Sequence, residues 1–391
     1  MVRGGRRGEE RDLSGEIERI LLASPAPGTE RHLLAARFGG PDARPKAYIQ
    51  AGLHADEWPG LLVAQHLLAR LHLLQGQGRV HGQVVVVPFA NPIGLSQYLN
   101  GHLSGRFDFG GSGNFNRDFP CLATRALPLL RDLLDDDPVA NATRVRAALV
   151  QAARTMSPRR EADWLKARLL SLSADADWAL DLHCDGQSLL HLYASARQQE
   201  MAVALARDLG AALVLLETDP GGSPFDEANA APWWRLAEAL PEYPLPLGCF
   251  AATVELRGRS DVDDALAAQD AEGILRFLGR QGVVSGLAYG DGPAPLVARL
   301  QAVDIAEAPA TGLMVYRRGP GERVAEGDIL GEIVNPAATS PAAGRTPVHS
   351  RTSGLLFARP VERFVRQGDH LCKVAGSSDL SHRQPGALLE D

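Results

Sequence analysis

Short apolar runs alternate with amphipathic segments along much of the chain. The runs "KAYIQAGL" from Lys46 and "QVVVVPFA" from Gln83 are apolar, are bounded by turn residues and predict two buried strands. Between them, the segment Leu61–Leu74 repeats its apolar positions with helical periodicity. A strand, a helix and a second strand in this order indicate an α/β layered domain.

The same alternation continues to about Leu278. We expect further strands at Trp178–Cys184, Ala211–Glu217 and Phe250–Gly258. We expect helices at Pro138–Ser157, Arg160–Ser171, Arg197–Gly210 and Asp261–Leu278. The segment Leu215–Trp234 lacks a clear period and predicts an irregular surface loop, with a helix that starts at Pro232.

The pattern changes near residue 295, where short strands and glycine turns take over. An internal repeat relates "TGLMVYRRGPGERVAEGDILGEI" from Thr311 to "SGLLFARPVERFVRQGDHLCKV" from Ser353. Two such halves suggest a small β-sandwich that resembles the barrel-sandwich hybrid fold. The hairpin between them has no lysine for a lipoyl or biotin group, so we expect a structural domain. The predicted organisation is an α/β domain at 1–295, a β domain at 296–376 and a weakly attached tail at 377–391.

Composition and charge exclude several classes of function. The 391 residues carry a net charge of −7, which argues against nucleic-acid binding. The four cysteines are far apart and form no C-x-x-C pair, so neither a disulfide framework nor a thiolate zinc site is indicated. No apolar run is long enough to span a bilayer, and the N-terminal segment lacks the apolar core of a signal peptide. We expect a soluble cytoplasmic protein without membrane insertion.

Two histidines and a glutamate stand where predicted strands end. In "GLHADEWPG", His54 and Glu57 form an H-x-x-E pair, a spacing that surface residues at a helix start would also give. In "DWALDLHCDG", His183 ends another strand, with Asp181 two residues earlier on the same face. Ligand sites gather at the carboxyl ends of strands in α/β sheets. Two histidines and a carboxylate have the composition of a catalytic zinc site, so His54, Glu57 and His183 are the predicted metal ligands.

Other polar residues could supply what a hydrolytic metal site needs. Glu255 lies in the otherwise apolar strand "FAATVELRG" and could act as a general base, because partial burial would raise its pKa toward neutrality. Arg257 falls on the same face by alternation, so it is a partner of Glu255, a substrate-binding residue, or both. The glycine-rich loop "GRFDFGGSGNFNRDFP" offers Arg106, Asn116 and Arg117 as donors to a transition-state oxyanion and an anionic substrate.

The acidic stretch around Leu215–Trp234 leaves two interpretations open. The simpler one is a set of solvated surface charges. The other is a specificity loop that receives a cationic group of a substrate. The acidic residues that could contact such a group are Glu217, Asp219, Asp226, Glu227 and, outside the stretch, Asp185.

Taken in order, these motifs resemble the succinylglutamate desuccinylase/aspartoacylase family, a branch of the zinc carboxypeptidase-like superfamily. The resemblance covers roughly residues 46–278 and runs through "GLHADEWPG", "NPIGL", "NFNRDFP", "LDLHCD" and "ATVELRG". The sequence looks closest to an uncharacterised subgroup associated with arginine/ornithine transport. The resemblance implies a mixed eight-stranded sheet flanked by helices, with the C-terminal β domain covering the cleft.

The resemblance also implies a set of roles. These are one Zn²⁺ per chain on His54, Glu57 and His183, Glu255 as general base, Arg106 as oxyanion donor, and Asn116 with Arg117 as the clamp for a substrate carboxylate. The expected activity is hydrolysis of the amide bond of an N-acylated amino acid or a related small amide. The expected partner is therefore a small-molecule substrate.

Four questions stay open at this point. The rival functions are a zinc carboxypeptidase acting on short peptides and a non-catalytic, transport-associated binding protein. The mobile tyrosine of carboxypeptidases has no clear counterpart, and Tyr193, Tyr289 and Tyr316 are candidates. The sequence identifies neither the acyl group nor the amino acid, and it does not decide whether the chain forms a homo-oligomer.

Overall fold

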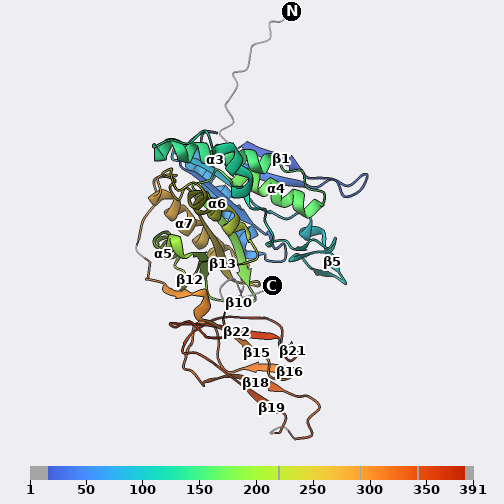
Figure 1. The fold of residues 1–391 in the computed structure, drawn as a ribbon. Coiled ribbons are helices and arrows are strands. Elements are labelled where there is room, and N and C mark those ends of the chain that lie inside the picture. Colours follow the sequence, from blue (N-terminus) through green and yellow to red (C-terminus); the bar gives the residue numbers. More distant parts are fainter. Residues whose placement is uncertain (1–15, 219–220, 291, 341–342, 384–391) are drawn as a thin grey trace, which may run out of the picture.

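A mixed sheet of nine strands forms the centre of the larger part of the molecule (Figure 1). The computed structural model describes residues 16–218, 221–290, 292–340 and 343–383. From one edge to the other the strands are β1 (Glu16–Leu21), β2 (His32–Phe38), β4 (Gln83–Val87), β3 (Lys46–Ala51), β9 (Trp178–Asp185), β13 (Phe250–Gly258), β11 (His191–Ser195), β12 (Leu213–Glu217) and β14 (Leu296–Arg299). The predicted α/β fold class is confirmed.

The sheet has nine strands rather than the eight that the resemblance implied. The apolar pattern of the sequence does not reveal the two edge strands, because few of their residues are buried. The outer strand β1 is largely exposed, and β14 is short, with a single buried residue, Ala298. An edge strand covered on one side only has no need of a continuous apolar run.

The central strands are parallel, and their direction decides where the site forms. β3 pairs in parallel with β4 and β9, and β9 pairs in parallel with β13. Side chains on both faces of β3 are buried, which explains why its apolar residues do not alternate with exposed polar ones. β11 runs antiparallel to β13 and parallel to β12. The carboxyl ends of β3, β9 and β13 therefore lie on the same side of the sheet, at one end of the strands. β12 runs in the opposite direction, so its carboxyl end lies at the other end.

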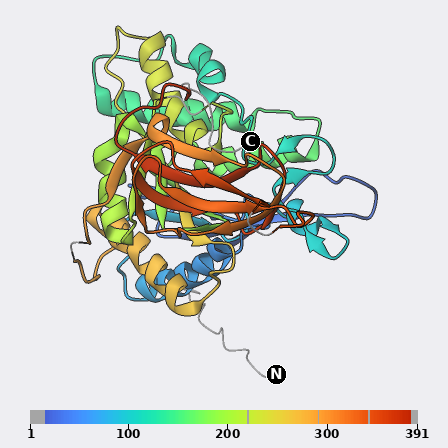
Figure 2. The same ribbon diagram turned by 90° about the horizontal axis from the view of Figure 1, so that it is seen from below.

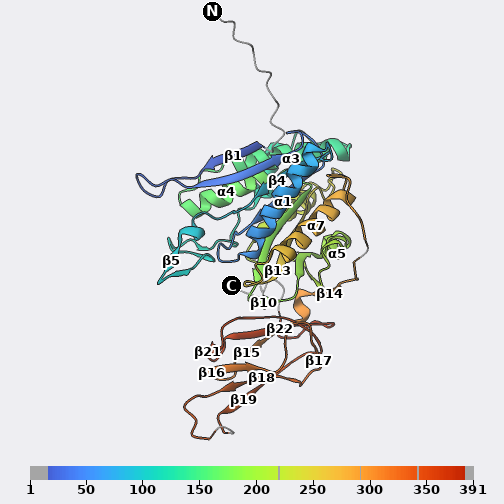
Figure 3. The ribbon, with the colours of Figure 1, turned by 180° about the vertical axis from the view of Figure 1, so that it is seen from behind.

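Helices cover both faces of the sheet, and each face has its own apolar core. One face carries α1 (Pro59–Gly76), α5 (Gln199–Leu209) and α7 (Asp264–Arg280), which lie in front in Figure 3. The other carries α2 (Leu122–Leu130), α3 (Pro138–Arg154), α4 (Glu161–Ser173) and α6 (Phe225–Ala239). Among the described residues, every helix is too short or too polar to span a lipid bilayer.

The prediction of a surface loop at Leu215–Trp234 is wrong. Helix α6 begins at Phe225, well before the expected start at Pro232, which lies inside the helix. Its first turns bury polar residues, including Asp226 and Glu227, so they show no apolar period. Within this stretch, Asp219 lies outside the described residues.

The C-terminal part is all β, as predicted, and its two sheets enclose a separate apolar core. One sheet contains β10 (Gln187–Ser188), β20 (Gly354–Arg359), β22 (His370–Gly376), β15 (Val303–Glu307) and β17 (Arg323–Val324). The other contains β19 (Arg345–His349), β18 (Ile329–Val334), β16 (Gly312–Tyr316) and β21 (Phe364–Val365). Two small hairpins, β5–β6 (Tyr98–Leu99, His102–Leu103) and β7–β8 (Phe107–Asp108, Gly113–Asn114), lie in the loop after β4.

The two parts are joined by strands as well as by the chain. β10 directly follows β9 but pairs with β20 in the C-terminal sheet. Seen from below, the C-terminal strands lie across the end of the α/β part (Figure 2). The boundaries at 295 and 376 stay predictions; the structure places Leu296–Arg299 in the large sheet. In the tail, the amide of Leu380 donates to the carbonyl of Gln301, and 384–391 lie outside the described residues.

Candidate metal centre

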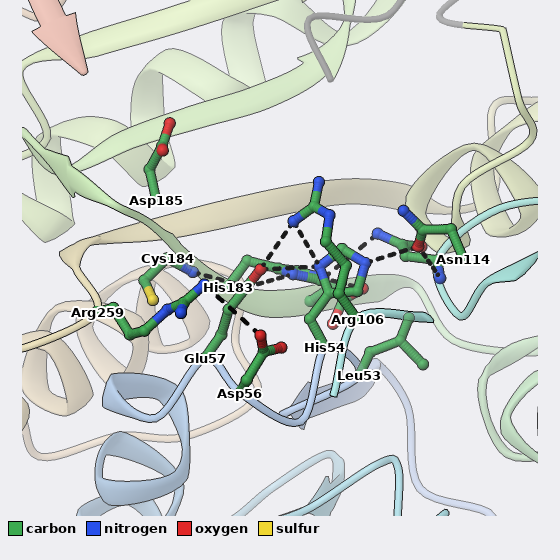
Figure 4. Close-up of polar contacts among 12 residues, drawn as sticks. Leu53, His54, Asp56, Glu57, Arg106, Asn114, His183, Cys184, Asp185 and Arg259 are labelled. Atoms are coloured by element: carbon green, nitrogen blue, oxygen red, sulfur yellow. Dashed lines mark hydrogen bonds and ion pairs between the residues drawn. The ribbon is translucent and has the colours of Figure 1, made fainter. Parts of the chain in front are cut away.

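The three predicted ligands meet at the shared carboxyl edge of β3 and β9 (Figure 4). Donor atoms of His54, Glu57 and His183 all lie within 4.8 Å of one another. The register pairs Ala51 with Leu182, so the loop after β3 begins level with His183. All three residues are at most 4% exposed, which protects their mutual contacts from competition by water.

The carboxylate of Glu57 lies between the two imidazoles. Its Oε1 is 2.8 Å from Nδ1 of His54, and its Oε2 is 2.8 Å from Nδ1 of His183. Oε2 also accepts a hydrogen bond of 3.0 Å from the amide of Cys184. Burial by itself would raise the pKa of Glu57, but the two histidines outweigh it and hold that pKa well below its ordinary value. The residue is therefore ionised, as a metal ligand must be.

The outer nitrogens of both rings face oxygen atoms. Nε2 of His54 lies 2.8 Å from Oδ1 of Asn114, and Nε2 of His183 lies 2.9 Å from Oδ2 of Asp181. An imidazole whose outer N–H is held by an acceptor turns a lone pair inward on its other nitrogen. Two inward Nδ1 atoms and one carboxylate therefore fit a divalent transition metal such as zinc.

A buried chain of polar side chains continues behind Asp181. Nε2 of Gln50 donates to Oδ1 of Asp181 over 3.0 Å, and the hydroxyl of Tyr48 donates to Oε1 of Gln50 over 2.8 Å. Burial opposes a charge on His183, but the carboxylates of Asp181 and Glu57 raise its pKa well above the ordinary value. Asp181 therefore increases the basicity of the ring that it holds in place.

Close backbone contacts hold the loop that carries His54 and Glu57. The amide of Ala55 donates to the carbonyl of Gly105 over 3.1 Å. A Cβ atom on Gly105 would lie 2.5 Å from the amide nitrogen of Asp56, so only glycine allows this approach. The loop between β4 and α2 therefore fixes the position of the ligand loop.

Arg106 and Glu255 lie beside the ligands, where the sequence predicted them. Nη1 of Arg106 is 3.2 Å from Oε1 of Glu57 and 3.3 Å from Nδ1 of His54. Glu255 pairs in register with His183 on the neighbouring strand. Its Oε2 atom is buried and has no hydrogen-bond partner in the described chain. Burial, with a smaller effect of the charge on Glu57, raises the pKa of Glu255 to about 8.

Asn116 and Arg117 both line the same pocket. Oδ1 of Asn116 accepts from the amide of Phe225 over 2.8 Å, which ties it to the start of α6. Nη1 of Arg117 donates to the carbonyl of Asn116 over 2.9 Å. Their role as a carboxylate clamp stays a prediction.

Arg257 does not share a face with Glu255, so the alternation argument was wrong. The ladder between β13 and β9 has a bulge between Glu255 and Gly258, and Arg257 has a φ of 63°. A bulge turns the side chain that alternation would place on one face toward the other. Nη2 of Arg257 donates to Oδ2 of Asp270 on α7, and Arg257 does not line the pocket.

The ligands open into a pocket that both parts of the molecule line. Leu300 and Lys373 supply its wall from the C-terminal side. Nζ of Lys373 lies 2.8 Å from Oδ2 of Asp185, and both side chains are largely buried. Neither Asn114 nor Lys373 was singled out from the sequence. Nothing local signals Lys373, because its partner lies in a distant segment; Asn114 stands in the quoted loop two residues before Asn116.

The open candidates divide between the pocket and the rest of the structure. Glu217, Asp226, Asp185 and Tyr193 line the pocket. Glu227 does not, and its Oε1 lies 2.6 Å from Nη2 of Arg235. Tyr289 packs under the guanidinium of Arg280, and the hydroxyl of Tyr316 donates to the carbonyl of Leu371.

Comparison with known proteins identifies a matching family model and a related protein. Residues 43–280 match the family model of the succinylglutamate desuccinylase/aspartoacylase catalytic domain. N-alpha-acetyl-L-2,4-diaminobutyric acid deacetylase from Halomonas elongata is 26% identical over 345 residues, which cover 85% of this chain and 82% of that protein.

Two solved structures extend the likeness to the whole fold. A protein from Shewanella frigidimarina that is assigned to the succinylglutamate desuccinylase/aspartoacylase family is 26% identical to this chain. The TM-score is 0.81, and the match covers 93% of this chain and 97% of that one. A protein assigned to the same family from Shewanella amazonensis is 27% identical, with a TM-score of 0.80 over 92% and 98% of the two chains. The likeness therefore includes the C-terminal part.

We expect the substitution Asp181→Asn to weaken metal binding by about 10- to 100-fold, because the carboxylate that orients His183 is lost. Metal affinity is measured by competition with a chromogenic chelator. The control is Asp270→Asn, a buried aspartate on the other face of the sheet that contacts Arg257. Equal affinity in both variants would show that Asp181 does not act on a metal ligand.

We expect Gly105→Ala to lower stability by about 1 to 3 kcal/mol, because its Cβ would meet the backbone of the ligand loop. Bound metal should fall as well, since that loop carries two ligands. Gly76→Ala is the matched control, because a Cβ there meets nothing within 4 Å. Thermal unfolding measures the change in stability, and metal analysis measures the bound metal. An unchanged metal content would show that the contact at Gly105 is not needed for metal binding.

Proposed function

The chain belongs to the succinylglutamate desuccinylase/aspartoacylase family, and we propose that it is a zinc-dependent hydrolase of N-acylated amino acids. The observation that carries the proposal is the buried set of His54, Glu57 and His183 with Glu255 in register beside it. The similarity to a deacetylase of an acetylated amino acid supports the same reaction class. The cytoplasmic location, the transport-associated subgroup and homo-oligomer formation stay predictions.

The residues present divide the chemistry between them. A zinc ion held by His54, Glu57 and His183 would supply Lewis acidity that polarises the amide carbonyl and lowers the pKa of the attacking water. Glu255 takes a proton from that water and passes it to the leaving amine. A pKa raised by burial suits both steps, because the carboxyl group must accept and then release the proton near neutral pH.

Positive groups around the pocket complete the proposed mechanism. The guanidinium of Arg106, which contacts Glu57 and His54, stabilises the negative charge that develops on the carbonyl oxygen. Asn116 and Arg117 hold the carboxylate of the amino acid. Arg257 has no part in binding here, because it contacts Asp270 on the far face.

The C-terminal part limits the size of the substrate. Leu300 and Lys373 form part of the pocket wall, and Lys373 is fixed by its contact with Asp185. A wall at this place leaves room for a small amide and opposes the entry of a longer peptide. The geometry therefore favours a deacylase over a carboxypeptidase.

The test of this function combines metal analysis with a substrate panel. We expect about one zinc ion per chain and hydrolysis of N-acetyl or N-succinyl amino acids, with little cleavage of dipeptides and tripeptides. Removal of the metal with a chelator should abolish hydrolysis, and zinc should restore it. Faster cleavage of the peptides would identify a carboxypeptidase, whereas a metal-loaded protein that binds these amides without hydrolysing them would support the binding-protein alternative.

We expect Glu255→Gln to reduce kcat by at least about 100-fold without loss of bound metal, because a proton acceptor is removed and the ligands remain. Activity of the unsubstituted enzyme should fall as the pH drops through the pKa of Glu255, since only the carboxylate accepts a proton. Burial raises that pKa from 4.5 to about 8, and a bound cation would lower it again toward neutrality. A pH profile of kcat/KM measures this limb. Persistence of the same limb in Glu255→Gln would assign it to another group.

A further inference from the structure

The pocket continues from the metal ligands along the face of the sheet. In register, His191 pairs with Glu255 and Tyr193 pairs with Thr253, and two residues further along β11 Ser195 pairs with Glu217. At about 3.3 Å per residue, Glu217 lies roughly 13 Å along the strands from the row of Glu255. Thr253, Tyr193 and Glu217 all line the pocket. The inner end of the pocket therefore lies toward Glu217 at the end of β12.

Two carboxylates define this inner end. Glu217 ends β12 and is 8% exposed, and Asp226 in the first turn of α6 is 6% exposed. Both residues line the catalytic pocket and a small second void beside it. Oδ1 of Asp226 is buried and accepts no hydrogen bond within the described chain. A buried acceptor without a donor is costly unless a ligand supplies one.

The surrounding charges leave a place for a cation. The neighbouring acid Glu227 already contacts Arg235, and it faces the second void rather than the catalytic pocket. Burial is the main cause that raises the pKa of Asp226 to about 6, and the charge on Asp181 adds to it. A cationic group against this carboxylate would offset both effects.

The position of Asn116 identifies which half of the substrate approaches Asp226. Asn116 belongs to the proposed carboxylate clamp and accepts a hydrogen bond from Phe225, the residue before Asp226. The amino-acid half of the amide, rather than its acyl half, therefore lies beside the start of α6. Its side chain can point past Thr253 and Tyr193 toward the two acids.

We propose that Asp226 and Glu217 form a subsite for an ammonium group on the side chain of the substrate. The substrates are then Nα-acylated diamino acids, with the carboxylate at Asn116 and Arg117 and the side-chain amine at Asp226. This inference rests on the proposed deacylase function, which it deepens by naming the substrate class. The competing explanation is that Asp226 only stabilises the N-terminus of α6, where an acidic residue is favourable.

Pairs of substrates with equal shape distinguish these explanations. Nα-acetyl-2,4-diaminobutyrate is compared with Nα-acetylnorvaline, and Nα-acetylornithine with Nα-acetylnorleucine, because each pair exchanges only an ammonium for a methyl group. We expect kcat/KM of the zinc-loaded enzyme to favour the cationic member of at least one pair by about tenfold or more. The ratio within a pair cancels changes in the amount of active enzyme.

Three variants assign the selectivity to residues. Asp226→Asn and, separately, Glu217→Gln should bring the ratio close to one, mainly through slower turnover of the cationic substrate. Glu227→Gln is the matched control, since it removes the same charge one residue away, and it should leave the ratio unchanged. A role of Asp226 at the helix terminus alone would lower the Tm of Asp226→Asn and leave the ratio intact.

Calorimetric binding of the free amino acids separates this subsite from the reaction. The ligands are 2,4-diaminobutyrate and ornithine, with norvaline and norleucine as their neutral counterparts. Tighter binding of a diamino acid that Asp226→Asn abolishes would support the subsite even if no amide were hydrolysed, in which case only the deacylase function would fail. Equal turnover and equal binding within both pairs in the unsubstituted protein would overturn the subsite.

Discussion

The parallel alignment of β3, β9 and β13 is the constraint on which the site depends. Because the three strands run in the same direction with level registers, their carboxyl ends bring together residues that are far apart in sequence. The loop after β3 carries His54 and Glu57, β9 carries His183, and β13 carries Glu255 one strand further along. A single slip of register would turn His183 or Glu255 to the other face of the sheet. Burial of both faces of β3 under helices makes such a slip expensive, so the apolar core holds the polar site in place.

Compensation of buried charge explains how so many ionisable groups share this edge. The carboxylate of Glu57 lies between two imidazoles, and Asp181 lies between His183 and Gln50. These contacts give each charge an opposite charge or a donor, which a low-dielectric interior requires. Glu255 and Asp226 each also keep a buried oxygen that accepts no hydrogen bond within the described chain. Both residues line the pocket, so these two carboxylates lie where a substrate can reach them.

The sequence predicted the residues that local patterns mark, and it missed those whose position depends on an irregular strand or on contacts between distant segments. His54, His183 and Glu255 could be found because each is a polar residue in or after an apolar strand, so the local pattern that predicts the strand also locates the residue. Arg257 could not, because alternation holds only while a ladder is regular and the bulge after Glu255 interrupts it. Helix α6 was missed because its first turns bury the acids Asp226 and Glu227 next to apolar residues, which hides the apolar period. The partners Asn114 and Lys373 were missed because their contacts with His54 and Asp185 join distant segments and leave no periodic trace.

The contact between Lys373 and Asp185 makes the C-terminal part a component of the site's electrostatics as well as a wall. Burial is the largest influence on the pKa of Glu255; among the smaller ones, the charge on Asp185 raises that pKa and the charge on Lys373 lowers it. The two charges therefore offset each other while the parts stay together. Asp185 is further fixed by the amide of Gly186, directly before β10 joins the C-terminal sheet. Separation of the parts would remove the charge of Lys373 from the neighbourhood of Asp185, so the pKa of Glu255 depends in part on the C-terminal part.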